Sequence, residues 1–169
     1  MPASPRLAEI EKELELRYEI LNSAKKRLAM TDEIFAKTAI KQRIREELLP
    51  EIHQGEAEYW DLLAQEAGFC TVEEVDAGNA IVEVVREVEQ IENQPATNYP
   101  DELMRLLREI RDKLNEPGTP AAAKAKLALP LIPGILVYEL ELDTENSLRK
   151  LRKVGEPIKR LFRDATQKK

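Results

Sequence analysis

The chain has 169 residues, of which 43% are hydrophobic, 34% charged and 5% aromatic, and its formal net charge at pH 7 is −6. This size suffices for one compact domain, or for a helical extension and a small domain. Few aromatic and many charged residues favour helices packed with Leu, Ile, Val and Ala. A single cysteine excludes an intrachain disulfide, and the acidic balance disfavours nucleic acid as a partner.

The first third of the sequence predicts an antiparallel helical hairpin over residues 1–67. Ser4 and Pro5 are typical of a helix start, and a heptad-like seam follows at Leu7, Ile10, Leu14, Leu21, Ala24 and Leu28. Thr31–Glu33 provides a turn and an N-cap for a second helix, whose apolar stripe comprises Ile34, Phe35, Ala39, Ile40, Ile44, Leu48, Leu49, Ile52, Tyr59, Leu62 and Leu63. Because proline removes an intrahelical hydrogen bond, Pro50 predicts a kink or break between Glu46 and Glu51.

Further helices are predicted after Gly68, which is placed to end the second helix. Thr71 and Glu74 have the spacing of a capping box. The β-branched stripe from Val72 to Ile91 favours helix over a strand at residues 80–85, and Gly78-Asn79 divides it into a turn and a longer helix. Residues 93–100 are expected to be a loop and 101–114 another helix.

The segment from Lys126 to Asp143 predicts a β-hairpin. Leu127, Leu129 and Leu131 alternate before Pro133-Gly134, as do Leu136, Tyr138, Leu140 and Leu142 after it. A Pro-Gly pair suits a type II turn. Since two strands alone are marginal in water, helices of this chain, a partner or second copy, or a lipid surface must cover them.

A basic helix is predicted to end the chain. Residues 148–169 carry nine Lys/Arg against two Asp/Glu, a net of +7, whereas the other 147 residues carry 17 against 30, a net of −13. Asp143 or Thr144 provides an N-cap, and Gly155 and Pro157 are expected to kink or split the helix. Its basic face is suited to the acidic surface of this chain, an acidic partner or an anionic membrane. The predicted fold is α+β and predominantly α-helical, with residues 68–169 containing the β-hairpin and the basic helix.

The sequence gives little support for catalysis. His53 is the only histidine, which excludes a di-metal site built from two Glu-x-x-His pairs. Cys70 is expected to be a buried or incidental thiol, and phosphate loops and nucleophile elbows are absent. We therefore predict no catalytic, cofactor-binding or metal-binding residue. The start Met1-Pro-Ala-Ser-Pro-Arg has no signal-peptide pattern and no apolar run approaches 18 residues, so the expected location is the cytoplasm.

The residues that the sequence nominates for an interface come from three places. Trp60 is either a plug between the hairpin and the following helices or an interface anchor. The others lie on the predicted β-hairpin and on the basic helix: Leu136, Tyr138, Leu140, Leu142, Arg149, Lys150, Arg152 and Lys153. Exposed strand edges would template pairing with a partner or a second copy.

Two segments, together under half of the chain, carry a family resemblance. The run from Leu7 to His53 resembles the helical hairpin near the N-termini of bacterial conflict-system proteins with STAND-type NTPase, CHAT or caspase-like protease, or TIR domains. The run from Ala125 to Leu151 resembles their effector-associated adaptor regions. The resemblance implies a non-enzymatic adaptor between sensor and effector, with the effector activity on another chain. The alternative is a peripheral membrane-binding module that uses Leu131, Ile132, Ile135, Leu136 and the basic helix.

Overall fold

The computed structural model describes residues 5–93, 99–141 and 145–167, without the side chains of 137, 139–141, 145–151 and 167. Within these residues the chain forms helices and no strand. It divides into two compact units, Ser4–Tyr59 and Trp60–Lys169, which we term the hairpin unit and the C-terminal unit. The division falls inside one helix, so each unit is described separately.

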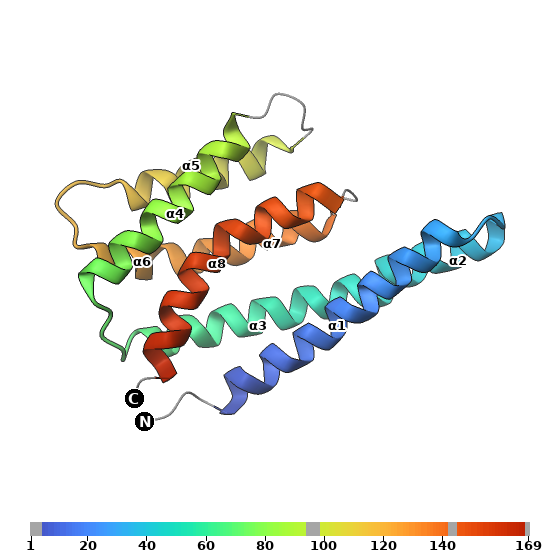
Figure 1. Ribbon diagram of the computed structural model, residues 1–169, viewed down its shortest axis with the longest axis horizontal. Coiled ribbons are helices and arrows are strands. Elements are labelled where there is room, and N and C mark those ends of the chain that lie inside the picture. The colour runs from blue at the N-terminus through green and yellow to red at the C-terminus, as the bar shows by residue number, and fades with distance from the viewer. Residues whose placement is uncertain (1–4, 94–98, 142–144, 168–169) are drawn as a thin grey trace. The chain divides into compact units, whose positions relative to one another are not determined.

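The hairpin unit has the predicted antiparallel arrangement. Helix α1 (Pro5–Met30) is followed by the turn and by α2 (Ile34–Arg43), the π-helical η1 (Ile44–Leu48) and α3 (Leu49–Ala67), which run back beside it (Figure 1). Glu33 caps α2, because its carboxylate accepts hydrogen bonds from the Phe35 and Ala36 amides at 2.9 and 2.7 Å. The predicted turn and N-cap at Thr31–Glu33 are therefore confirmed.

The predicted seam of α1 is buried at Leu7, Ile10, Leu14 and Leu21, which are at most 5% exposed. On α3, Gly55 allows the two helices to approach closely, since a Cβ there would lie 2.8 Å from Leu14 Cδ2. Contact at this distance requires a neighbour to shift. Glycine at position 55 thus sets the spacing of the hairpin at this level.

The interruption predicted near Pro50 takes the form of the π-helical segment η1. The amide of Leu49 donates to the carbonyl of Ile44, five residues back, in place of the α-helical step of four. A π-turn is a common way to accommodate one extra residue in a helix. It also marks a change in burial: no residue of α2 or η1, all of which are described, is buried, whereas α3 buries Ile52, Gly55 and Tyr59.

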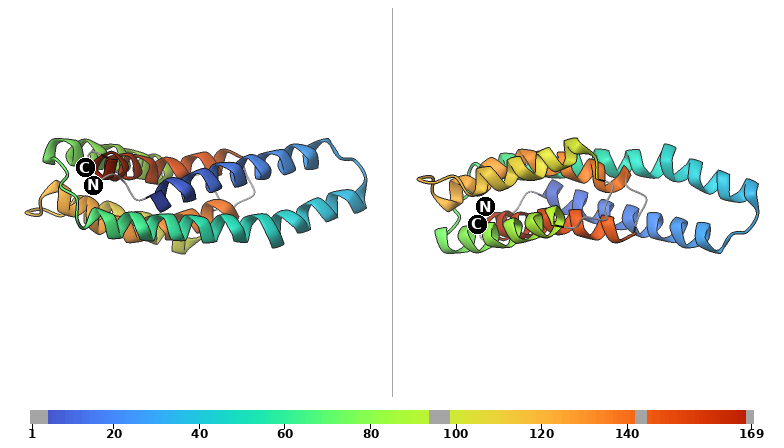
Figure 2. Two further views of the ribbon diagram at one scale, coloured as in Figure 1. Left: turned by 90° about the horizontal axis from the view of Figure 1, so that it is seen from below. Right: turned by 90° about the horizontal axis from the view of Figure 1, so that it is seen from above.

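The C-terminal unit consists of α4 (Glu74–Glu92), α5 (Asp101–Leu114), α6 (Ala121–Ala128), the 3-10 turn η2 (Leu129–Leu131), α7 (Ile132–Glu141) and α8 (Glu145–Gln167), after the last turns of α3. Helix α4 contacts α5, α6 and α8, and α7 contacts α5 and α8. Figure 2 shows α4 and α8 on one side of the unit and α5 to α7 on the other. The apolar stripes of α4, α5 and α8 form the core between them.

The β-hairpin prediction is wrong, because residues 121–141 form α6, η2 and α7. Their buried residues follow steps of three and four, as a helix face requires: Ala125, Ala128, Leu129, Ile132, Ile135 and Leu136. Leu127, which the alternating pattern placed with Leu129, is 50% exposed. Pro133 lies in the first turn of α7, where a missing N–H leaves no helical acceptor unsatisfied. The Pro-Gly pair therefore starts a helix instead of turning a ribbon.

Two predicted helix divisions are not found. Helix α4 continues through Gly78-Asn79, and α8 is not split at Gly155 and Pro157, because it continues through both. Gly155 instead permits close packing, since a Cβ there would lie 2.9 Å from Ile132 Cγ2 and 3.5 Å from the Trp60 ring. The proposed caps at Asp143 and Thr144 lie outside the described residues. Helix over strand at residues 80–85 is confirmed.

The capping box expected at Thr71 and Glu74 does not form. Helix α4 begins at Glu74, and its N-cap, Glu73, makes no side-chain capping hydrogen bond. The Glu74 carboxylate instead accepts hydrogen bonds from the amides of Ala121 and Ala122, at 2.8 and 3.1 Å. It therefore caps α6, a helix 47 residues later in the chain, where a negative charge is favoured.

Replacing Pro50 with Ala should stabilise the protein. The change restores an amide donor and removes the clash of the proline ring with the preceding turn. Proline inside a helix costs on the order of 3 kcal/mol, and the π-turn before it relieves part of that cost. We expect a higher thermal midpoint and a stronger helical circular dichroism signal. Pro5→Ala is the matched control, because Pro5 is the first residue of α1 and should change neither. An unchanged or lower midpoint for Pro50→Ala would contradict this account.

Replacing Gly155 with Ala should destabilise the C-terminal unit, although alanine is the better helix former. The gain in helix propensity is about 1 kcal/mol, but overpacking against Ile132 costs roughly 1–3 kcal/mol. Gly78→Ala is the control, because its Cβ would meet nothing within 4 Å, and it should stabilise the fold by up to about 1 kcal/mol. Urea unfolding of both variants tests the difference in sign, and equal shifts would refute close packing at Gly155.

Candidate interaction surface

Two nominated residues of the 127–142 segment make contacts within the C-terminal unit. Leu136 is 5% exposed. Tyr138 is half-buried, and its hydroxyl donates a hydrogen bond to Glu102 Oε2 at 2.6 Å, which ties α7 to α5. The side chain of Leu140 and the whole of Leu142 lie outside the described residues. Leu136 thus contributes to the core and not to an accessible surface.

Trp60 occupies the position expected of a core plug. It is 3% exposed, and its ring lies against Gly155 in the interior of the C-terminal unit. Aromatic rings of this size contribute most when they are fully buried. Of the two roles that the sequence allowed for Trp60, the geometry fits the structural one.

The basic helix α8 packs on its own chain. Val154, Ile158 and Phe162 are fully buried, and Arg160 forms an ion pair with Glu83 of α4 at 3.0 Å. Arg152 is half-buried and Lys153 exposed, while the side chains of Arg149 and Lys150 lie outside the described residues. The described apolar face of α8 is thus covered at Val154, Ile158 and Phe162, and Arg160 pairs with the chain's own acidic surface, one of the roles expected for the basic helix.

Five of the exposed large apolar side chains in the described residues lie on the hairpin unit. Met30, Ile34 and Phe35, which flank the turn, are 85%, 74% and 82% exposed; we call them the hairpin tip. Leu16 and Ile20 of α1 are 60% and 52% exposed. Ile34 and Phe35 were predicted to belong to the inner stripe, and no surface role was predicted for Leu16 and Ile20. The signal for the latter pair was their spacing of four outside the seam, which predicts a second apolar stripe on α1.

A groove of about 440 Å³ lies between α1 and the helices that return beside it. We call it the hairpin groove; it is lined by Ile20, Ser23, Ala24, Arg27, Ile40, Arg43, Glu47, Leu48 and Glu51. Its apolar members come from both helices, and its charged members are two arginines and two glutamates. The π-turn contributes directly, because Glu47 and Leu48 belong to η1. A surface that is apolar in part and ringed by both charge signs suits a protein partner.

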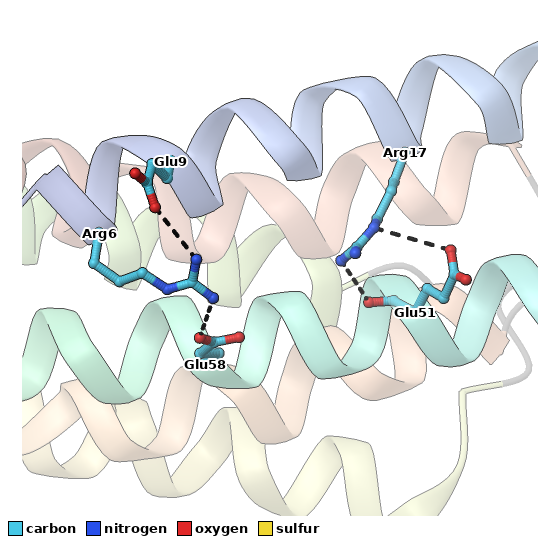
Figure 3. Close-up of polar contacts among 5 residues, drawn as sticks. All are labelled: Arg6, Glu9, Arg17, Glu51 and Glu58. Carbon is cyan, nitrogen blue, oxygen red and sulfur yellow. Dashed lines mark hydrogen bonds and ion pairs between the residues drawn. The ribbon is translucent and has the colours of Figure 1, made fainter.

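Polar contacts fasten α1 to α3 in the half of the hairpin away from the turn. Arg6 bridges Glu58 at 2.7 Å and Glu9 at 3.4 Å, and Arg17 donates to the Glu51 carbonyl at 3.2 Å (Figure 3). The hydrogen bond and charge of Glu58 raise the pKa of Arg6 above its ordinary value. These contacts fix the register of the two helices.

A further link between α1 and α3 is buried. The Tyr18 hydroxyl donates to Glu56 Oε1 at 2.7 Å, and Glu56 is 6% exposed. Since a buried carboxyl requires hydrogen-bond partners, this contact is specific to the observed register. The half of the hairpin away from the turn is therefore held by both apolar and polar contacts.

Charge is distributed unevenly along the hairpin. Residues 20–45, around the turn, contain seven Lys/Arg and two Asp/Glu, a net of +5. The two flanking segments, 5–19 and 46–59, contain three Lys/Arg and ten Asp/Glu, a net of −7. The hairpin is thus basic at the turn and acidic at the opposite end, which we call the hairpin base.

Other parts of the described chain offer less distinctive sites. A cavity of about 490 Å³ lies between α4 and α8 and is lined by Glu73, Asp76, Glu83, Arg160 and Asp164, among others. A third, of about 850 Å³, lies along the C-terminal half of α5 and is lined mostly by charged residues. Cys70 is 7% exposed, and its carbonyl accepts a hydrogen bond from Lys126 Nζ at 3.1 Å. His53 is half-buried.

Neither a metal cluster nor a membrane span is found in the described part of the chain. No group of three or more His, Cys, Asp or Glu residues there is arranged to hold a metal ion. None of its helices combines the length and the apolar character needed to cross a membrane. Comparison of the chain with protein-family models, curated proteins and solved structures gives no match. Functional inference therefore starts from the surface of the hairpin unit.

Replacing Leu136 with Lys should destabilise or unfold the protein, since it places a charge in the core. Burying an uncompensated charge and losing the leucine contacts together cost at least about 3 kcal/mol. Leu127→Lys is the matched control: it is half exposed and should shift stability by no more than about 0.5 kcal/mol. Urea unfolding measures both changes. A folded, equally stable Leu136→Lys protein would contradict the helical packing of α7.

Proposed function

We propose that this chain is a non-enzymatic interaction protein that binds another protein through the hairpin tip. The observation that carries the proposal is the exposure of Met30, Ile34 and Phe35 around one turn. Removing such side chains from water is favourable by about 25 cal/mol per Å². Phe35 provides the kind of apolar anchor around which interfaces concentrate their binding energy. Clustered exposed apolar residues mark interaction sites more often than single ones do.

The class of partner follows from the resemblance to conflict-system adaptor regions. We propose that the chain links a sensor to an effector in a bacterial defence system, and that the partner carries a protease, NTPase or TIR-type domain. The segment that resembles the N-terminal helical hairpin of those proteins, Leu7 to His53, is also the segment with the exposed tip. Any effector chemistry would lie on the partner.

The membrane-binding alternative has less support. It relied on Ile132, Ile135 and Leu136, which are 1%, 1% and 5% exposed, and on the basic helix, whose apolar residues Val154, Ile158 and Phe162 are buried. An interfacial helix needs its apolar face available to lipid. We therefore favour a protein partner.

The proposal is tested with proteins encoded by neighbouring genes that carry a protease, NTPase or TIR domain. Binding is measured by isothermal titration calorimetry with purified proteins. Phe35→Ala should weaken binding at least tenfold, because a hot-spot truncation costs about 2 kcal/mol or more. Phe69→Ala is the matched control, since Phe69 is 83% exposed on the C-terminal unit and its loss should leave affinity unchanged. Equal affinity of wild type and Phe35→Ala would refute the tip as the binding site.

A further inference from the structure

We infer that the hairpin groove binds the hairpin of a second copy of this chain, in an antiparallel arrangement that places the turn of each hairpin beside the base of the other. The product is a four-helix bundle with two-fold symmetry. The inference rests on the proposed function in that the hairpin is an interaction element, but it concerns a different surface, the groove instead of the tip.

The hairpin leaves apolar side chains of α1 exposed to solvent. Two helices in one layer bury only the seam between them, and stable helical domains place a second layer on that one. Leu16 and Ile20 form a second apolar stripe on α1, 60% and 52% exposed. Ile20 lines the groove from α1, and Ile40 and Leu48 line it from the returning helices. A second hairpin laid on the groove would cover this stripe.

The charge distribution along the hairpin favours a second copy in the groove, in an antiparallel orientation. The turn half carries +5 and the base −7, so a parallel arrangement would oppose like charges at both ends. A two-fold axis perpendicular to the helices instead brings the basic half of each copy to the acidic base of the other. Such an interface must be complementary to itself, and opposite charge at the two ends of one surface meets that requirement.

The charged residues of the groove follow the same order along the returning helices. Arg43 lies nearer the turn, and Glu47 and Glu51 lie nearer the base. Antiparallel pairing therefore brings the Arg43 end of each groove to the Glu51 end of the other. The internal contact of Arg43 with Glu47, at 3.1 Å between side chains 75% and 63% exposed, is of the kind that contributes little, so both groups can exchange partners.

The available area fits a weak, specific dimer. An overlap about 30 Å long and two helices, about 20 Å, wide covers about 600 Å² per copy. The total of about 1,200 Å² is at the lower limit of specific interfaces, so we expect a dissociation constant on the order of micromolar. An anionic lipid surface would also attract the basic half, but it offers nothing to the acidic base, and it enters the test as the competing occupant.

Light scattering after size exclusion tests the dimer. Wild type at about 50 µM and low salt should show about twice the 19.3 kDa chain mass, and the dimer should weaken as salt screens the charges. Ile20→Lys should be monomeric with unchanged helicity. Val82→Lys, at a site 56% exposed on α4, is the control and should remain dimeric. A monomeric wild type at that concentration, or a dimeric Ile20→Lys, would overturn the inference.

Charge exchange tests the electrostatic pairing. Arg27→Glu/Arg43→Glu and Glu47→Lys/Glu51→Lys should each dimerise at least tenfold more weakly than wild type, because each opposes like charges. Mixed in equal amounts, the two variants should form a heterodimer. Arg105→Glu/Arg108→Glu, on α5, changes the net charge as much as the first variant does and should dimerise as wild type. Weak dimers without rescue in the mixture would reject the pairing.

Flotation with vesicles of anionic lipid identifies the competing occupant. If wild type floats, and Arg27→Glu/Arg43→Glu does not, while no dimer forms, the occupant is a membrane and the inference is wrong. The proposed function is tested separately: Ile20→Lys should still bind the effector through Phe35, whereas Phe35→Ala should lose the effector and remain a dimer. Failure of the dimer alone leaves the proposed function in place.

Discussion

Close helix contact at glycine is the constraint on which both units depend. In the hairpin unit Gly55 receives Leu14, and in the C-terminal unit Gly155 receives Ile132 and Trp60. With few aromatic residues, the chain builds its core from Leu, Ile, Val and Ala, which fill space only when helices approach closely. At each glycine an added methyl group would lie within 3.0 Å of a neighbouring side chain. A larger residue at either position would therefore require the neighbouring side chain to move.

The two halves of the hairpin differ in burial. Its α1 and α3 share a buried seam, ion pairs and the Tyr18–Glu56 hydrogen bond. Beyond the π-turn, α2 buries no residue. Pro50 lies two residues after η1. Proline is unfavourable inside helices, and here it stands at the boundary between α3, which has buried residues, and η1 and α2, which have none. The half near the turn can remain exposed, because contacts in the other half already fix the register of α1 against α3.

Several elements could be predicted because local signals agreed with the tertiary environment. The α1 seam, the turn at Thr31–Glu33 and the helix at residues 101–114 each combine periodic apolar residues with start or stop signals. The β-hairpin failed because alternating leucines and a Pro-Gly pair fit a ribbon as well as they fit helices with a start at Pro133. Short apolar runs cannot separate the two periods. Only burial, with Leu136 inside and Leu127 outside, decides between them.

The candidate surface was missed for a different reason. Ile34 and Phe35 have the spacing of an inner stripe, and no local rule reveals that α2 buries no residue. Glu74 shows the same limit, since its capping partner lies 47 residues away in α6. Sequence periodicity identifies which residues share a helix face, whereas the neighbour that covers the face depends on the whole fold.

Net charge was informative only at the scale of single elements. The value of −6 for the whole chain conceals two basic segments, residues 20–45 at +5 and 148–169 at +7. The two segments differ in the exposure of the apolar residues that lie beside the basic ones. On α8, Val154, Ile158 and Phe162 are buried and Arg160 pairs with Glu83, so this helix makes both apolar and charged contacts within its own chain. Around the turn, by contrast, the basic residues accompany Ile20, Ile34 and Phe35, all more than half exposed. A partner for such a surface is expected to supply both acidic and apolar contacts, and the proposed second copy offers both through its acidic hairpin base and the neighbouring groove.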